Sequence, residues 1–283
     1  MSTKQKFGGP WTVDKLSILS DYLDFYTTAL KNQPFDLLYI DAFAGTGKIL
    51  IGDAEQYEEI DGSARLALQS KGMFAEYIFI EKKKAFAREL EEMVEMDFPD
   101  KKNRVKIENG DCNHVLLKIC QKVNWQRVRA VLFIDPYAAD VKWETLEAVA
   151  DTGAIDVWYL FPFHAANRMM TRNGKIDPSW ERKLNSIFGD DSWKNRFYYD
   201  DPQTNLFDTT EVVKYASTDL LKQYVEERLG TIFSKVSNDS RILYNSKSSP
   251  LFLFCFAVSN KWPGAIALAL KGANYILKDQ KPT

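Results

Sequence analysis

Five short runs of apolar residues recur along the first part of the chain, and each run is almost continuous instead of alternating with polar residues. Continuous apolarity indicates strands that are buried on both faces, which is typical of parallel sheets. The stretches between the runs have helical composition or periodicity, so the sequence predicts an open α/β sheet with helices on both faces. The runs are Asp36–Asp41, Glu76–Glu81, Arg104–Glu108, Ala130–Asp135 and Ala154–Phe161, and the helical stretches include Lys83–Met96, Asn113–Val123 and Trp143–Ala150.

The remaining elements complete the expected sheet. Apolar residues recur at intervals of three or four over Thr12–Lys31, which predicts an amphipathic helix before the first strand. After the fifth strand the expected elements are a helix over Thr210–Leu229, strands near Thr231–Val236 and Leu251–Ser259, and a closing helix over Pro263–Leu277. The prediction is a doubly wound, mostly parallel α/β sheet of seven strands, in one domain over residues 1–283.

A basic and aromatic insertion, residues 165–205, interrupts this pattern after the fifth strand. Its segment Ala165–Tyr199 has seven Lys and Arg residues against four acidic residues, so it carries a net charge of +3 in a chain of net charge −2. Its aromatic residues are Trp180, Trp193, Phe197, Tyr198 and Tyr199. Cationic groups suit phosphates and aromatic rings suit stacked bases, so this insertion is expected to bind the substrate, with nucleic acid as the first candidate. The candidate substrate-binding residues are Arg168, Arg172, Arg182 and Lys183.

Two alternatives for this insertion stay open. Its charge is small enough that a protein partner is a serious rival to nucleic acid. It could also be a solvated surface helix whose aromatic residues fold into the core.

Composition limits the class of protein. The 37 basic and 39 acidic residues nearly balance, so any contact with nucleic acid must be a local patch. The longest apolar run, Leu251–Val258, is far shorter than the ~20 residues of a membrane helix. We therefore expect a soluble, cytoplasmic protein. The scattered cysteines Cys112, Cys120 and Cys255 are expected to be buried thiols, and no metal site is expected.

The candidate binding site lies at the carboxyl ends of the strands, where ligands bind in such sheets. The first strand is followed by the loop Asp41–Gly47, whose two glycines let the backbone turn tightly and approach a ligand. The loop is no Walker A motif, because Ala42 replaces the first glycine and Ile49 follows the lysine. It also fails the dinucleotide fingerprint, because Leu50 replaces the third glycine.

Acidic residues follow the next three strands. Glu81 could accept the hydroxyls of a ribose, and Asp111 could accept the amine of an adenine. With Asp135, they would suit an adenosine that carries a positive charge. Each also has a purely structural explanation: Glu81 could favour the start of a helix, Asp111 could cap one, and Asp135-Pro136 could end a strand.

Together these motifs resemble class I S-adenosylmethionine-dependent methyltransferases, and more closely the three-Cys-motif partner protein family, TcmP. The likeness covers nearly the whole chain. It rests on Gly9-Pro10-Trp11, Tyr39–Gly47, Glu81, Asn109-Gly110-Asp111, Phe133–Tyr137, and Leu251–Asn260 followed by Pro263-Gly264. It implies a methyltransferase-type fold, S-adenosylmethionine as the cofactor and a partner protein encoded nearby.

The resemblance also implies roles for individual residues. The implied cofactor-binding residues are Asp41, Phe43, Ala44, Gly45 and Gly47 at the methionine and ribose end, Glu81 at the ribose, and Asp111 and Cys112 at the adenine. The residues that would face the methyl acceptor are Asp135, Pro136 and Tyr137, and His164 is a further catalytic candidate because it follows the fifth strand. The chain departs from the [DNS]-P-P-[YFW] motif of enzymes that methylate base amino groups, because Tyr137 stands where the second proline should be.

The expected function is methyl transfer from S-adenosylmethionine to an unidentified acceptor, with nucleic acid as a candidate and a partner protein assisting. The incomplete motif favours one alternative, a catalytically inactive binding or scaffold subunit. A nicotinamide oxidoreductase is the third hypothesis, and the missing third glycine of the dinucleotide fingerprint opposes it.

Overall fold

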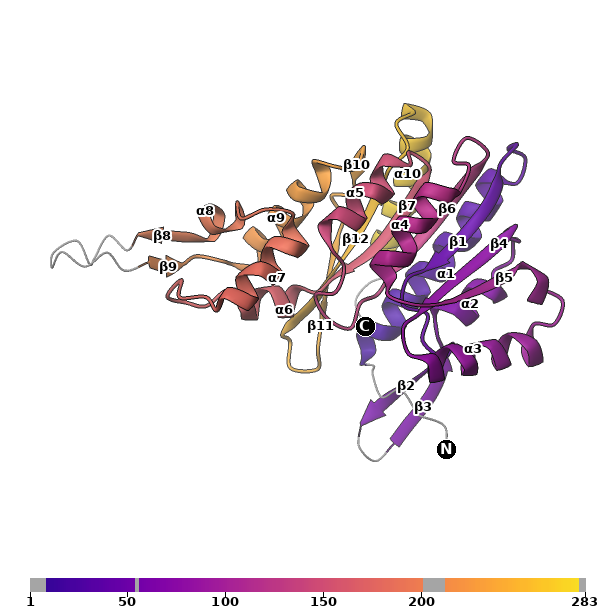
Figure 1. Cartoon of the computed structure of the whole chain (residues 1–283), viewed down its shortest axis with the longest axis horizontal. Coiled ribbons are helices and arrows are strands. Elements are labelled where there is room, and N and C mark those ends of the chain that lie inside the picture. The colour runs from indigo at the N-terminus through magenta and orange to yellow at the C-terminus, as the bar shows by residue number, and fades with distance from the viewer. Residues whose placement is uncertain (1–8, 54–55, 201–211, 280–283) are drawn as a thin grey trace, which may run out of the picture.

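The computed structural model describes residues 9–53, 56–200 and 212–279. A sheet of eight strands runs through the molecule (Figure 1). Five parallel strands stand in the order β5-β4-β1-β6-β7, β12 is antiparallel to β7, and β10 and β11 each pair with β12. These strands are β1 (Asp36–Asp41), β4 (Glu76–Glu81), β5 (Val105–Asn109), β6 (Val128–Ile134), β7 (Ile155–Phe161), β10 (Lys235–Val236), β11 (Arg241–Tyr244) and β12 (Pro250–Val258). The doubly wound, mostly parallel α/β sheet is confirmed, with β11 as a strand that the sequence did not indicate.

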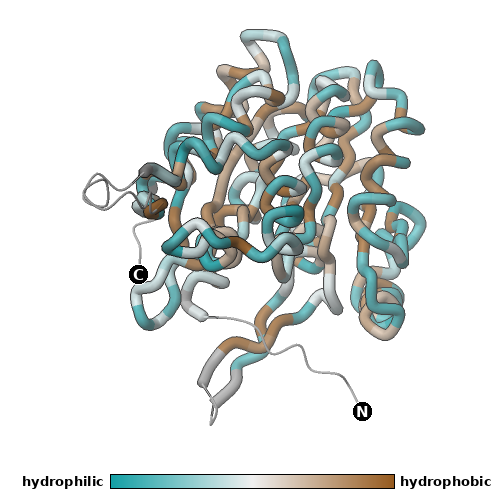
Figure 2. The backbone as a smooth tube through the Cα atoms, turned by 60° about the vertical axis from the view of Figure 1, so that its left-hand side comes forward, coloured by the Kyte–Doolittle hydropathy of each residue, from teal (hydrophilic) through white to brown (hydrophobic). Residues whose placement is uncertain are grey.

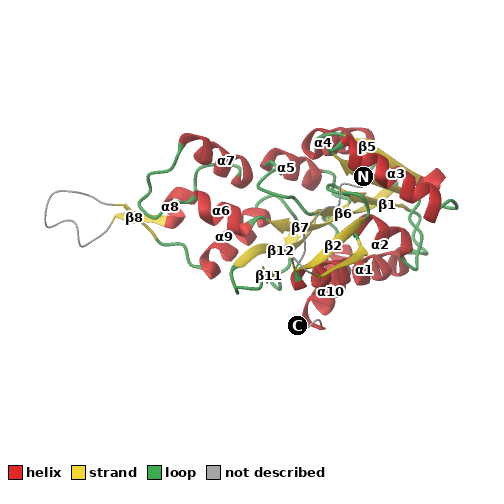
Figure 3. Ribbon diagram, turned by 90° about the horizontal axis from the view of Figure 1, so that it is seen from below, coloured by secondary structure: helices red, strands yellow, loops and turns green. Residues whose placement is uncertain are grey.

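Successive side chains of each strand enter two different cores, one on each face of the sheet. Along β1, Leu38 and Ile40 pack on the side of α4 and α5, whereas Leu37 and Tyr39 pack on the side of α1 and α2. Figure 3 shows these helices on opposite sides of the strands. The flanking helices are α1 (Pro10–Leu30), α2 (Ser63–Gln69), α3 (Lys84–Asp97), α4 (Cys112–Lys122), α5 (Trp143–Asp151) and α10 (Pro263–Asp279), with a short 3-10 turn, η1 (Lys102–Arg104), before β5. Burial on both faces explains the continuous apolar runs, and the alternation of brown and teal along the helices in Figure 2 is typical of helices that bury one side.

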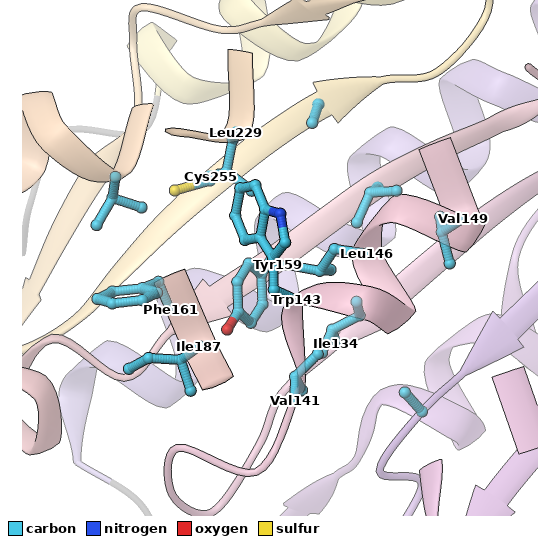
Figure 4. Close-up of a cluster of buried hydrophobic side chains, with 14 of the residues drawn as sticks. Ile134, Val141, Trp143, Leu146, Val149, Tyr159, Phe161, Ile187, Leu229 and Cys255 are labelled. Carbon is cyan, nitrogen blue, oxygen red and sulfur yellow. The ribbon is translucent and has the colours of Figure 1, made fainter. Parts of the chain in front are cut away.

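One core lies between β6, β7 and β12 and the helices α5, α7 (Pro178–Phe188) and α9 (Thr218–Gly230) (Figure 4). Trp143 and Tyr159 lie together near its centre. Trp193 and Phe197 of the short helix α8 (Trp193–Phe197) are fully buried in the same core, where the Trp193 ring N–H donates to Asn185 Oδ1 at 2.7 Å. These two aromatic residues of the insertion therefore support the fold, and the expectation that they could stack on bases is wrong.

The insertion consists of α6 (Phe163–Met169), α7, α8 and a strand, β8 (Tyr198–Asp200). β8 pairs with β9 (Val212–Lys214) in a two-stranded ribbon that extends away from the sheet (Figure 1). The helix expected over Thr210–Leu229 is therefore shorter at its start. It begins after Ser217, whose hydroxyl caps it by accepting the Leu220 N–H at 3.1 Å. Residues 201–205 of the insertion and 210–211 of the expected helix lie outside the described residues.

A β-hairpin that the sequence did not indicate stands between the loop after β1 and helix α2. Its strands are β2 (Lys48–Asp53) and β3 (Gln56–Asp61). At the base of the hairpin the Gly62 N–H donates to the Gly47 carbonyl at 2.8 Å. The end of β3 therefore lies against the end of the loop that follows β1. A Cβ on Gly62 would lie 3.0 Å from the Gly47 carbonyl carbon, so this close return favours glycine at residue 62.

The three cysteines are free thiols with different degrees of burial. Cys112 and Cys255 are buried, and Cys120 is partly buried. Burial raises the pKa of both Cys112 and Cys120 to about 12. In the described part of the chain, no helix combines the length and apolarity needed to cross a bilayer.

Candidate functional site

The loop after β1 has a conformation that its glycines make possible. Gly45 and Gly47 have φ angles of 61° and 80°, in the left-handed region that favours glycine. The Ala44 N–H donates to the Ile80 carbonyl at 3.0 Å and holds the loop against β4. A Cβ on Gly47 would lie 2.7 Å from the Met93 methyl carbon of α3. The positive φ angle therefore accounts for glycine at residue 47 more than this contact does, because the end of the Met93 side chain can move.

Asp41 ends β1 and lines neither of the two cavities described below. Its carboxylate is fully buried, accepts the Phe43 N–H at 3.1 Å, and lies 3.4 Å from the Tyr39 hydroxyl. Burial raises its pKa to about 7, which the bonds from Ser63 and the Phe43 N–H only partly offset. Asp41 therefore shapes the loop, and its implied role in cofactor binding stays a prediction.

Glu81 joins two turns of the site. One carboxylate oxygen accepts the Gly45 N–H at 3.0 Å, and the other accepts the Lys83 N–H at 2.7 Å. The residue is buried at the end of β4. A carboxylate has about four acceptor positions, so Glu81 can still accept two ligand hydroxyls.

Two adjoining cavities open at this edge of the sheet. The α4 cavity, of about 350 Å³, is lined by Glu81, Asp111 and Cys112 among others. The α1 cavity, of about 260 Å³, is lined by Gly45, Gly47, Asp135 and Pro136, by Lys15 and Trp11 of α1, and by Leu251 and Phe252 of β12. Phe43 and Tyr137 line both cavities, and their rings meet edge to face with centroids 6.5 Å apart. The Phe43–Tyr137 pair therefore forms a partition between two compartments of one site.

In the α4 cavity, Asp111 both caps a helix and faces the binding space. Its carboxylate accepts the Asn113 N–H at 3.1 Å and is 3.2 Å from the Lys82 ammonium. These hydrogen bonds outweigh partial burial and lower its pKa. The Asn113 side chain then bonds the Asp140 carbonyl and the Lys142 N–H, at 2.9 Å each, which ties the loops after β5 and β6 together. Sequence reasoning missed Asn113, although its place after an N-cap acid next to the site was a usable signal.

In the α1 cavity, Asp135 forms an ion pair with Lys15. The Lys15 side chain is only 4% exposed, and its ammonium also lies 4.6 Å from the centroid of the Trp11 ring. Asp135 remains 22% exposed toward the cavity. Sequence reasoning missed Lys15. The available signal was a lysine four residues before Leu19, on the apolar face of the predicted first helix.

Tyr137 is partly exposed and receives a cation on its ring. Burial, followed by the nearby carboxylates of Glu81 and Asp135, raises its pKa. The Lys83 ammonium lies 5.6 Å from the Tyr137 ring centroid and 4.6 Å from that of Phe86. The aromatic partition between the cavities is thus bordered by a lysine that sequence reasoning did not single out.

Most of the remaining candidate residues lie away from this site. His164 is exposed on α6 and lines neither cavity. Arg168 and Arg182 are exposed on α6 and α7, and Arg172 lines a separate cavity of about 770 Å³ beside Tyr198 and β9. Lys183 alone lines the α4 cavity, 3.6 Å from Asp140. The four proposed substrate-binding residues therefore belong to at least two places.

Within the described residues, no group of three or more His, Cys, Asp or Glu side chains could hold a metal ion.

Comparisons with known proteins support the fold. No family model and no curated protein matches this chain. A Legionella pneumophila protein of the DUF519 family has a similar structure, with a TM-score of 0.52 and 13% identity over 95% of this chain and 93% of that one. The Streptomyces achromogenes O-methyltransferase TomG in complex with SAM is less similar, with a TM-score of 0.41 and 10% identity over 91% of this chain and 92% of that one. A spermidine synthase has a TM-score of 0.44 and 10% identity over 96% of this chain and 66% of that one. The likeness to the Legionella pneumophila protein agrees with the doubly wound α/β fold, whereas membership of the three-Cys-motif partner family stays a prediction.

Proposed function

We propose that this chain is an S-adenosylmethionine-dependent methyltransferase that holds its cofactor across the α4 and α1 cavities. The observation that carries the proposal is the pair of cavities separated by Phe43 and Tyr137. Carboxylates of Glu81 and Asp111 line one side of this partition, and the Lys15–Asp135 pair lies on the other.

The residues of the α4 cavity fit an adenosine. Glu81 keeps free acceptor positions for ribose hydroxyls, and Asp111 offers a carboxylate to an adenine amine. Ile80, Phe43 and Cys112 supply apolar walls. Such a site, mostly apolar with a few placed polar groups, is typical of small-molecule pockets.

The residues of the α1 cavity fit the methyl acceptor. S-adenosylmethionine supplies a methyl group on a sulfonium, which a nucleophile can displace directly. Asp135 would orient that nucleophile, because Lys15 occupies its Oδ2, while Oδ1 makes no hydrogen bond within the described part of the chain. The ring of Tyr137 would stack on a planar acceptor. The protein contributes mainly alignment and exclusion of water.

Nucleic acid is the proposed acceptor class, and a protein encoded nearby is the proposed partner, as the resemblance to the three-Cys-motif partner family implies. Arg168 and Arg172 would meet the more distant phosphates of such an acceptor, because both are exposed and neither forms an ion pair with a described residue. A cytoplasmic location belongs to the same proposal.

Radiolabelled S-adenosylmethionine offered with total DNA, RNA and protein tests this function, with and without the neighbouring gene product. We expect one acceptor fraction to become labelled. Asp135→Ala should remove the label while sparing cofactor affinity, and Asp151→Ala, at the exposed end of α5, is the control. Labelling by Asp135→Ala at the wild-type rate would contradict the role of Asp135.

An inactive binding subunit is the second candidate, because the motif lacks its second proline and Asp135 already has a cationic partner. The same assay separates the two. Cofactor binding without labelling of any fraction, even with the partner present, would favour the scaffold.

A further inference from the structure

A third cavity, of about 450 Å³, lies at the opposite edge of the sheet, where β6 and β7 begin. It lies against α1 and α10 and shares no lining residue with the α4 and α1 cavities. Its volume falls within the range of small-molecule sites, roughly 300–1,000 Å³. The residues that decide its chemistry are Tyr22, Phe25, Phe35, Arg129, Asp156 and Trp262.

Asp156 supplies a carboxylate that lacks an ionic partner. The Tyr22 hydroxyl donates to its Oδ2 at 2.8 Å, and no cation among the described residues lies within 4 Å of it. Burial raises the pKa of Asp156 to about 7, although the Tyr22 bond and the more distant Arg129 charge oppose that rise. Tyr26 is the other titratable group that interacts with it. A ligand ammonium at Asp156 would supply the missing partner.

Arg129 supplies a cation with unused donors. Its Nη1 donates to the carbonyls of Trp125 and Val128, at 2.8 Å each, and its guanidinium lies 3.9 Å from the centroid of the Phe35 ring. A guanidinium has five N–H donors in a fixed fork, so those on Nε and Nη2 remain for an anion. Arg129 and Asp156 both line the cavity but form no ion pair with each other, so each is available to a ligand group of opposite charge.

The rest of the lining is aromatic and aliphatic. Tyr22, Phe25 and Phe35 line the cavity together with the polar pair, and so does Trp262, which comes directly before α10 and is 70% exposed. Rings of this kind bind flat apolar groups and also attract ammonium groups. The cavity therefore offers an anion, a cation and an apolar wall together.

We propose that this cavity binds a free amino acid with a large apolar side chain. Its ammonium would lie at Asp156, its carboxylate at Arg129, and its side chain among the aromatic rings. This site is independent of the proposed methyl transfer, because it lies at the other edge of the sheet.

Calorimetry with L-phenylalanine and L-tryptophan tests the proposal, with phenethylamine and 3-phenylpropionate as probes that each lack one charge. Loss of one charge-assisted hydrogen bond should weaken binding roughly tenfold to a hundredfold. Both single-charge probes should therefore bind more weakly than L-phenylalanine by that factor.

Variants identify the residues. Asp156→Asn keeps an oxygen for the Tyr22 bond and should weaken the binding of L-phenylalanine about tenfold or more. Phenethylamine, which also carries an ammonium, should lose affinity by nearly the same factor. Ala29→Phe, on the partly exposed rim of the cavity, should block both amino acids without entering the core. The proposal is overturned if neither amino acid binds wild-type protein at millimolar concentration, if the single-charge probes bind as tightly, or if Ala29→Phe binds normally.

Discussion

Replacing Lys15 by methionine should destabilise the protein and disable the site, because it leaves the Asp135 carboxylate without its cation. Lys15 is 4% exposed and Asp135 is 22% exposed. Removing one member of a buried ion pair costs about 3–5 kcal/mol, and the remaining access of water to Asp135 places the expected loss near the lower end, about 3 kcal/mol. Methionine keeps the length and apolar stem of lysine, so the loss of packing is small.

Urea denaturation of a double-mutant cycle measures the coupling. The cycle comprises Lys15→Met, Asp135→Asn and the double variant, and we expect the double variant to recover much of the loss. The matched control is Lys71→Met, since Lys71 pairs with Asp24 at 3.0 Å but is 87% exposed. An exposed pair is worth about 0.2–1 kcal/mol, so the control should change little. A Lys15–Asp135 coupling no larger than the about 0.2–1 kcal/mol of an exposed ion pair would refute the reasoning.

Three further predictions concern the same site. Glu81→Gln should lower the free energy of unfolding by about 1–3 kcal/mol in urea denaturation and weaken cofactor binding, because an amide nitrogen cannot accept the N–H of Gly45 or Lys83. Unchanged stability would contradict the role of Glu81 in joining these two turns. Asp41→Asn should gain stability relative to wild type as pH rises from about 4 to 7, because the folded protein retains a proton on Asp41 that the unfolded chain releases; melting curves with a pH-independent difference would count against it. Cys112, whose pKa is about 12, should react with iodoacetamide far more slowly in the folded protein than in urea, and mass spectrometry of that peptide would show equal rates if the thiol were exposed.

The sheet could be predicted from the sequence because each of its parallel strands is buried on both faces. Leu37 and Leu38 enter opposite cores, so the strand shows no alternation and its parallel setting can be inferred. The β2–β3 hairpin could not be found in this way, because its strands pair only with each other and the side chains whose burial is described, in residues 48–51 and 58–61, are exposed or partly exposed. The ribbon of β8 and β9 was missed for the same reason, and the expected helix was extended over β9.

The candidate site could be predicted only where its residues follow strand ends. Glu81, Asp111 and Asp135 do so, and all three line the two cavities. Lys15 comes from the first helix, more than a hundred residues before its partner in sequence, and no local pattern records that ion pair. His164 illustrates the opposite error, because its place after a strand did not bring its side chain to the cavities.

Binding of S-adenosylmethionine to the purified protein tests the central claim most directly. Calorimetry should show one cofactor per chain, and a ligand at 100 times its Kd should stabilise the fold by about 2.7 kcal/mol, a clear rise in melting temperature. Asp156→Asn, at the opposite edge of the sheet, should bind the cofactor like wild type, whereas Glu81→Gln should bind it more weakly. The absence of both heat and a melting shift at millimolar cofactor would contradict the account.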